Sequence, residues 1–269
     1  MQTSPRIPAP QVGPLLRAWR ERRRLSQMAL SLDAGISQRH LSYVEGGRAT
    51  PSREMVLRIA EELEVPLRDR NALLLAAGYA PAFPERGLDD PALGAARQVV
   101  EAILRAHAPF PALAVDRHWV MLAANAAVAP LLAGVANRAL LTPPVNVLRL
   151  SLHPRGLLPM IANAGEWRAH ILERLRRQVA AGADPVLAAL LAELAALPGA
   201  ADRVAGSPGL VPGGIAVPLV LDTPAGRLAL ISTTTVFGTP VEVTLAELAI
   251  EAFYPADEAT AAALRALAT

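Results

Sequence analysis

The spacing of apolar residues in the first eighty positions predicts a run of five short helices. Serines able to cap a helix N-terminus stand at Ser26, Ser37 and Ser52, and glycines that favour a helix stop stand at Gly35 and Gly78. The predicted helices span residues 14–24, 26–34, 37–45, 52–63 and 67–77. This part of the chain is therefore expected to be an all-α domain.

Beyond residue 90 the pattern changes to short β-rich runs separated by helices. Two strands are expected around the turn Asp116-Arg117-His118, and several helices follow them, one of them the Ala-rich stretch 184–197. The predicted elements outside this helical middle are a helix over 91–107, strands over 111–116, 119–125, 214–221, 227–237 and 245–255, and a last helix over 257–268. Strands and helices of this kind form a domain of the α+β class.

A stretch with Pro81, Pro84 and Gly87 within a few positions interrupts both patterns and is the expected hinge between domains. The predicted organisation is a disordered arm over 1–12, a helical domain over 13–79, a linker over 80–90 and a second domain over 91–269. A chain of 269 residues is long enough for two such cores.

Charged residues are distributed unevenly between the two predicted domains. The 26 basic residues are all arginine; residues 1–80 hold 12 of them against 8 acids, and residues 81–269 hold 14 against 16. The excess positive charge therefore lies in the helical domain, as expected for a partner rich in phosphate.

Several classes of protein are not expected. The chain has no cysteine, its first residues lack the apolar segment of a signal peptide, and no apolar run reaches the ~18 residues of a membrane span. It also lacks a phosphate-cradling glycine loop, an HExxH metal motif and a GxSxG elbow. We expect a cytoplasmic protein that is not an enzyme, with no catalytic residues, no metal, no cofactor and no membrane partner.

The helix that begins at Ser37 has the pattern of a DNA reader. Leu41 and Val44 lie three apart on one inward face, which leaves Gln38, Arg39, Ser42 and Tyr43 free to point outward. Glutamine can bind adenine through two hydrogen bonds and arginine can bind guanine in the same way. Tyr43 could equally pack on its own helix, and His40 is balanced between phosphate contact and solvent.

Residues 13–78, with Trp19-Arg20 before this pair of helices and Pro51-Ser52 after it, resemble the helix-turn-helix of the phage-repressor or xenobiotic-response-element class. The resemblance implies that Gln27 and Arg48 bind phosphates, and that Arg20 and Glu45 form a structural pair between helices. The predicted DNA-binding residues are Gln27, Ser37, Gln38, Arg39, His40, Ser42, Tyr43 and Arg48.

The second domain resembles the ligand-binding domain of MmyB-like transcription regulators over about residues 91–256, in phrases such as VDRHWVMLAAN, EWRAHILERLRR and VEVTLAEL. The implied fold is α+β, with the five-helix helix-turn-helix domain followed by a PAS-like antiparallel five-stranded sheet covered by helices. The implied function is a one-component regulator that combines a DNA reader with a sensor of a small apolar ligand, fatty acids being one class associated with this family. The expected partner is a palindromic double-stranded operator, whose two half-sites would each bind one subunit of a homodimer.

A fatty acid needs a partner for its head group. Burial of about twelve methylenes at ~0.8 kcal/mol each approaches ~10 kcal/mol, against association costs of ~4–15 kcal/mol. The candidate partners are Asn125, Asn146, Arg149, His153 and Arg168. Helix capping is the alternative for both asparagines, and a surface ion pair is the alternative for both arginines.

A different function for the second domain stays open from the residues alone. It could dimerise or dock another protein through its Ala-rich helices, over 184–197 and 257–268, and bind no ligand. Uptake of an apolar probe at one saturable site would indicate the ligand sensor, whereas self-association without such uptake would indicate the dimerisation or docking module.

Overall fold

The computed structural model describes residues 11–199, 216–240 and 242–267, which form two compact units. The first unit comprises Met1–Arg86 with Thr239–Ala246, and the second comprises Gly87–Gly238 with Glu247–Thr269. Most of the predicted N-terminal arm and the start of the strand predicted over 214–221 lie outside the described residues.

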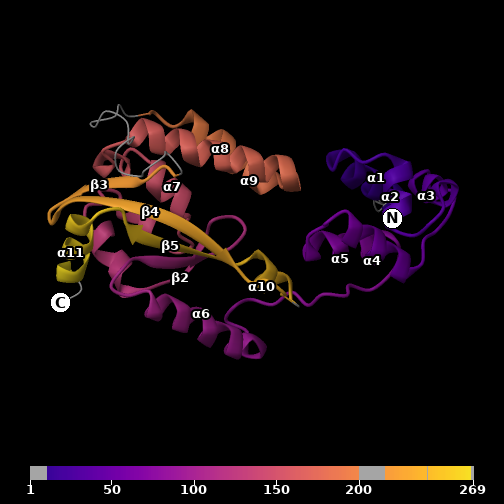
Figure 1. The fold of residues 1–269 in the computed structure, drawn as a ribbon, viewed down its shortest axis with the longest axis horizontal. Helices are drawn as coiled ribbons and strands as arrows, with labels where there is room; N and C mark the ends of the chain where they lie inside the picture. Colours follow the sequence, from indigo (N-terminus) through magenta and orange to yellow (C-terminus); the bar gives the residue numbers. More distant parts are fainter. Residues whose placement is uncertain (1–10, 200–215, 241, 268–269) are drawn as a thin grey trace, which may run out of the picture. The chain divides into compact units, whose positions relative to one another are not determined.

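The first unit contains the five helices expected from the sequence (Figure 1). Ser26, Ser37 and Ser52 each cap a helix by accepting a hydrogen bond from the backbone N–H three residues further on, at 3.0, 3.2 and 3.2 Å. The helices are α1 (Val12–Arg22), α2 (Gln27–Asp33), α3 (Gln38–Glu45), α4 (Arg53–Glu62) and α5 (Leu67–Ala76). The capping serines therefore fix the starts of α2, α3 and α4, as predicted.

A buried ion pair joins α1 to α3 inside this unit. The Arg20 guanidinium donates to both carboxylate oxygens of Glu45 at 2.7 and 2.9 Å and to the Leu25 carbonyl at 2.8 Å. The two side chains are 10% and 2% exposed, and the hydrogen bond to Glu45 raises the pKa of Arg20. Gly13 makes the close approach possible, because a Cβ there would lie 2.3 Å from the Val44 carbonyl oxygen. The pairing of Arg20 with Glu45, implied by the resemblance, is present.

The first unit also includes a segment from late in the chain. This segment, residues 239–246, follows the strand β4 (Gly226–Val236), and its Val243 amide donates to the Pro84 carbonyl at 3.0 Å. Arg86 pairs with the Glu242 carboxylate, and the Thr244 hydroxyl donates to the Arg86 carbonyl. The chain then returns to the second unit as the strand β5 (Ala249–Pro255).

The second unit is built on a five-stranded antiparallel sheet of order β2-β1-β5-β4-β3, with the PAS-like α+β architecture expected from the sequence (Figure 1). Its strands are β1 (Ala112–Val115), β2 (Met121–Ala124), β3 (Leu219–Thr223), β4 (Gly226–Val236) and β5 (Ala249–Pro255). Its helices are η1 (Pro91–Leu93), α6 (Gly94–Ala106), η2 (Ala126–Leu132), η3 (Arg138–Leu141), α7 (Val147–Leu152), η4 (Leu158–Met160), α8 (Ala164–Gly182), α9 (Pro185–Ala196) and α11 (Glu258–Leu267). A further short helix, α10 (Val243–Glu247), precedes β5.

Alternation along the strands gives this sheet two apolar faces. On β1, Leu113 and Val115 join the large core formed with α7, α8 and α9, whereas Ala112 and Ala114 join a smaller core that includes Val100 of α6. On β5, Glu251 and Phe253 are on the side of the large core, whereas Ile250 and Ala252 belong to the smaller core. Because the side-chain period of a strand is two, a one-residue slip would exchange the two faces.

Two predicted strands begin later than expected, and the one predicted over 214–221 begins only at Leu219. The sequence predicts a strand over 245–255, but α10 occupies the first residues and β5 begins only at Ala249. Ala249 pairs with Val236, the last residue of β4, so residues before Ala249 have no partner strand in the β4–β5 ladder. Backbone hydrogen bonds there are made within a helical turn instead.

Replacement of Glu45 by alanine is expected to lower the free energy of unfolding of the first unit by about 3–5 kcal/mol, because the nearly buried guanidinium of Arg20 loses the carboxylate to which it donates two hydrogen bonds. Urea unfolding of the full chain, followed by circular dichroism, measures the change. The control is Glu62→Ala, which removes an exposed carboxylate from the end of α4. Equal effects of the two substitutions would contradict the importance of the pair.

Candidate functional site

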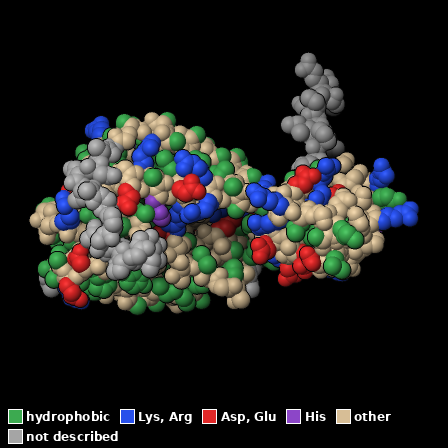
Figure 2. All heavy atoms as spheres, turned by 45° about the horizontal axis from the view of Figure 1, so that its top comes forward, with side chains coloured by type: hydrophobic (Ala, Val, Ile, Leu, Met, Phe, Trp, Pro, Cys, Tyr) green, Lys and Arg blue, Asp and Glu red, His purple; other side chains and the backbone are tan. Residues whose placement is uncertain are grey.

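Helix α3 presents a polar surface to solvent and an apolar one to the core. Leu41 and Val44 are fully buried, whereas Gln38, Arg39 and Ser42 are exposed. Gly35, at φ +62°, makes the turn that places α3 after α2, a conformation that side chains with a Cβ rarely adopt. Arginine side chains of this unit are visible at its surface in blue in Figure 2.

Two arginine side chains lie close to the ring of Tyr43. Arg39 donates from Nε to the Tyr43 hydroxyl at 3.1 Å, and its guanidinium carbon lies 5.4 Å from the ring centroid. The guanidinium of Arg48, just past α3, lies 6.0 Å from the same centroid. Tyr43 thus packs along its own helix and holds two cations beside the exposed face of α3.

The other DNA-binding candidates lie at the edges of this face. Gln27 is half-buried, and its amide donates to Glu45 at 2.8 Å, which ties it to the buried ion pair. Ser37 uses its hydroxyl oxygen to cap α3, and His40 is half-buried. All eight candidates come from α2, α3 or the residues that directly flank α3.

Two arginines of the run Arg22-Arg23-Arg24 make contacts within the first unit. Arg23 donates to the carbonyls of Leu63 and Glu64 at 2.9 and 3.0 Å, where α4 ends. Arg22 lies over the ring of Trp19 at 4.4 Å. These contacts account for Arg22 and Arg23 without a contact to DNA.

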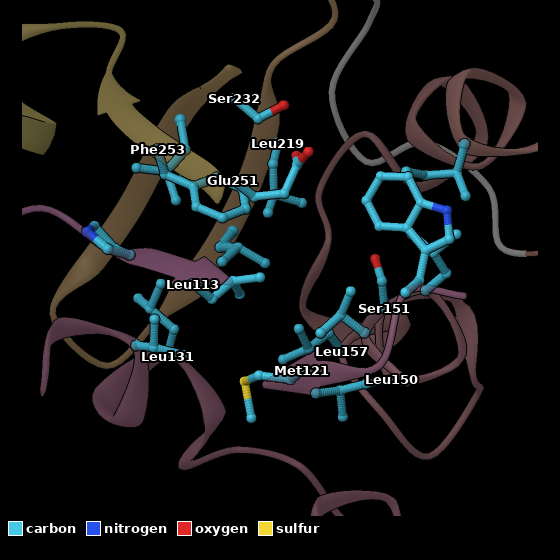
Figure 3. Close-up of a pocket in the computed structure, with 18 of the residues that line it drawn as sticks. Leu113, Met121, Leu131, Leu150, Ser151, Leu157, Leu219, Ser232, Glu251 and Phe253 are labelled. Atoms are coloured by element: carbon cyan, nitrogen blue, oxygen red, sulfur yellow. The ribbon is translucent and has the colours of Figure 1, made fainter. Parts of the chain in front are cut away.

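The second unit encloses an apolar cavity of ≈ 100 Å³ between the sheet and its helices (Figure 3). Leucines from β1, β3, β4, η2 and α7 line it, with Trp119, Met121, Trp167 and Phe253. Its polar lining side chains are Ser151, Arg174, Ser232 and Glu251. A cavity of this composition suits a ligand that is mostly apolar with a small polar part.

The polar lining residues form two groups. Ser232 and Glu251 lie near each other on the neighbouring strands β4 and β5, as Figure 3 shows, and Arg174 of α8 pairs with Glu251 at 2.7 Å. Ser151 of α7 lies apart from them and accepts a hydrogen bond from the indole N–H of Trp167 at 2.9 Å.

The two asparagines predicted to bind ligand do not line the cavity and stabilise the backbone instead. Asn125 donates to the Leu104 and Phe110 carbonyls and accepts from the Ala112 amide, so it joins the end of β2 to the connection between α6 and β1. Asn125 occupies the N-cap position of η2, as expected, but its side chain makes no capping hydrogen bond there. For Asn146 the capping hydrogen bond is present, because its side chain accepts from the Arg149 amide at the start of α7.

The other three candidates also lie outside the cavity lining. Arg149 forms two hydrogen bonds with Glu193 of α9, at 2.6 and 2.8 Å, which lower the pKa of that carboxyl. His153 accepts from the Arg155 amide. Arg168 donates to three carbonyls near the end of α9, those of Leu194, Ala195 and Leu197, rather than to the glutamates expected as its surface partners.

Sequence reasoning missed all four polar residues of the cavity. Glu251 carried the clearest signal, because it is the single charge within the apolar run AIEAFYP. Its partner, Arg174, lies 77 positions away on α8, among other arginines, and has no local feature that distinguishes it.

Comparison with known proteins matches the two parts of the chain to two different family models. Residues 96–267, more than half of the chain, match the model of the MmyB-like transcription regulator ligand-binding domain. The chain belongs to the family of MmyB-like transcription regulators. Residues 11–73 of this MmyB-like regulator match a helix-turn-helix domain.

Two curated relatives of the MmyB-like regulator carry regulator names. A putative HTH-type transcriptional regulatory protein of Methanoculleus marisnigri is 34% identical over 116 residues, which cover 41% of this chain and 37% of the relative. The uncharacterised HTH-type transcriptional regulator RghRB of Bacillus subtilis is 38% identical over 74 residues, 27% of this chain and 51% of the relative. The matches thus span about half or less of each relative's length.

Among the described residues of the MmyB-like regulator, no helix has the length and apolar character of a membrane span. Within the same ranges, no group of three or more His, Asp or Glu side chains could hold a metal ion.

Substitution of Ser151 by alanine is expected to destabilise the second unit by about 1–3 kcal/mol, because the buried indole N–H of Trp167 loses its acceptor. The partner change Trp167→Phe removes the donor as well as part of the ring. In a double-mutant cycle measured by urea unfolding, S151A should cost less in the W167F background than in the natural one. Strictly additive costs would show that the hydrogen bond contributes nothing.

Proposed function

We propose that this protein is a one-component transcriptional regulator, in which the first unit reads double-stranded DNA and the second senses a small apolar ligand. The observation that carries the DNA-binding half is helix α3, which is capped at Ser37, packed through Leu41 and Val44, and exposes Gln38 and Arg39 at its N-terminal end. The N-terminal residues of a recognition helix are those that reach base edges in the major groove.

The exposed residues of α3 divide by chemistry into two roles. Gln38 and Arg39 suit base edges, and Ser42 can hydrogen-bond to any base. Arg48, His40, Ser37 and Gln27, at the margins of the face, suit phosphates and would set the position of the helix without reading sequence. Tyr43 lies close to both Arg39 and Arg48, 5.4 and 6.0 Å from its ring centroid, and accepts a hydrogen bond from Arg39.

Two copies of α3 about 34 Å apart would occupy successive major grooves. We therefore propose a homodimer on a roughly palindromic operator. The net excess of arginine in the first eighty residues adds an attraction to phosphate that does not depend on sequence.

Arg39→Ala is expected to relax specificity at one base position in each half-site, at a cost of about 1–3 kcal/mol for the preferred base. Arg48→Ala should instead weaken binding to all sequences and flatten the salt dependence. Selection from a random duplex library, followed by titration of preferred and substituted sites, measures both. Arg97→Ala, which removes an exposed arginine of α6, is the control. Uniform weakening by Arg39→Ala would contradict its role as a base reader.

The ligand-binding half of the proposal is supported by the cavity. Its lining is mainly apolar, with leucine the most frequent residue, which favours an aliphatic or aromatic ligand, and fatty acids are one such class. At ≈ 100 Å³ it is smaller than the ~300–1,000 Å³ typical of ligand pockets. A twelve-carbon chain would need the lining to move, whereas a shorter tail or a single ring would fit with little change.

Native mass spectrometry of the freshly purified full-length protein tests this half. We expect a dimer with excess mass on each subunit that is released on denaturation and identifies the ligand class. A dimer without such mass, which also takes up nothing from a panel of lipids and metabolites, would favour the alternative that residues 91–269 form a dimerisation or interaction module.

A further inference from the structure

The two charged side chains that face the cavity already neutralise each other. Arg174 donates to both carboxylate oxygens of Glu251, at 2.7 and 3.3 Å. The side chain of Glu251 is 6% exposed and that of Arg174 is 20% exposed. The two side chains at the polar end of the cavity therefore carry no net charge together, and both are mostly buried.

Other contacts hold this pair in place. The Arg174 guanidinium lies 4.3 Å from the ring centroid of Trp119 and donates to the Thr234 hydroxyl oxygen at 2.6 Å. Thr234 in turn donates to Glu251 at 2.6 Å, from the position directly opposite it in the β4–β5 ladder. The Trp119 ring is fixed by its own hydrogen bond to Gln178, at 2.9 Å. Arg174 cannot swing towards a ligand without losing several contacts at once.

A charged ligand head would disturb this balance. A carboxylate beside Glu251 would place two negative charges against one guanidinium, and an ammonium would place two positive charges against one carboxylate. In a poorly hydrated site an uncompensated charge is costly, because it loses its hydration without gaining an equal partner. An uncharged head avoids this cost.

The same end of the cavity offers hydrogen bonds to an uncharged head. The Ser232 hydroxyl can both donate and accept, and it lies beside Glu251 in Figure 3. An ionised carboxylate has about four acceptor positions, and the hydrogen bonds described for Glu251 come from two Arg174 nitrogens and Thr234. A ligand O–H or N–H therefore finds an acceptor in Glu251, and a ligand oxygen finds a donor in Ser232.

We propose that the cavity selects an uncharged ligand with an apolar body and a hydrogen-bonding head, such as an alcohol or a primary amide, over a carboxylate with the same tail. This selectivity rests on the proposed ligand-sensing function and narrows its ligand class. Fatty acids share the apolar tail of such a ligand but would bring the disfavoured charge.

The test compares six-carbon probes that share one tail: hexan-1-ol, hexanamide, hexanoate and hexylammonium. Dissociation constants for the full-length protein at neutral pH are measured by ligand-observed NMR. The alcohol and the amide are expected to bind about tenfold more tightly than either charged probe. Equal or tighter binding of hexanoate would overturn the selectivity while leaving ligand sensing intact. Binding of none of the four would count against ligand sensing itself, and the selectivity would fall with it.

Substitution of the acid tests the electrostatic cause. Glu251→Gln keeps the shape of the side chain but leaves the Arg174 charge uncompensated, so hexanoate should gain about tenfold relative to hexan-1-ol. The matched control is Glu173→Gln on the exposed surface of α8, which should leave the preference unchanged. An unchanged preference in folded E251Q would contradict the proposal.

A second variant covers the case in which E251Q does not fold, as judged by circular dichroism. Arg174→Gln leaves Glu251 as the uncompensated charge and should raise the affinity for hexylammonium relative to hexan-1-ol. A folded R174Q protein that keeps the natural order of preference would overturn the proposal independently.

Discussion

Each unit of this protein depends on a buried arginine–glutamate pair. Burial of a single charge would cost several kcal/mol, so Arg20 and Glu45 are compatible with the core of the first unit only when they face each other. The same holds for Arg174 and Glu251 in the second unit. Because the partners come from different elements, each pair excludes arrangements of those elements that separate the charges. The pairs therefore act more on the choice of structure than on its net stability.

The position of each pair links it to the surface or cavity beside it. Glu45 is the last residue of α3, so its contacts with Arg20 and Gln27 set the orientation of the helix that presents Gln38 and Arg39. In the second unit the pair lies in the lining of the cavity itself. The Arg174–Glu251 ion pair, which joins α8 to β5, thus also supplies the charged groups of the cavity lining.

The predictions from the sequence succeed where the determining interactions are local. The caps at Ser26, Ser37 and Ser52 act within four residues, and alternation along a strand needs only its own sequence, which is why the helices of the first unit and the strands of the second could be predicted. Resemblance supplied the pairing of Arg20 with Glu45. The polar end of the cavity could not be predicted, because it depends on the register of β4 against β5 and on the face that α8 turns to the sheet. The candidates that were chosen instead, such as Arg149 and Arg168, have partners on the neighbouring helix α9.

The connection between β4 and β5 gives a physical reason for the two functions to share one chain. Ser232 and Glu251, on these strands, line the cavity, and the residues that join the strands, 239–246, belong to the first unit. There Glu242 pairs with Arg86, at the end of the stretch that follows the helix-turn-helix. A ligand can alter DNA affinity only if it binds two arrangements of the protein differently. Any change in the relative positions of β4 and β5 must be accommodated by this covalent connection, whose residues 239–246 belong to the first unit.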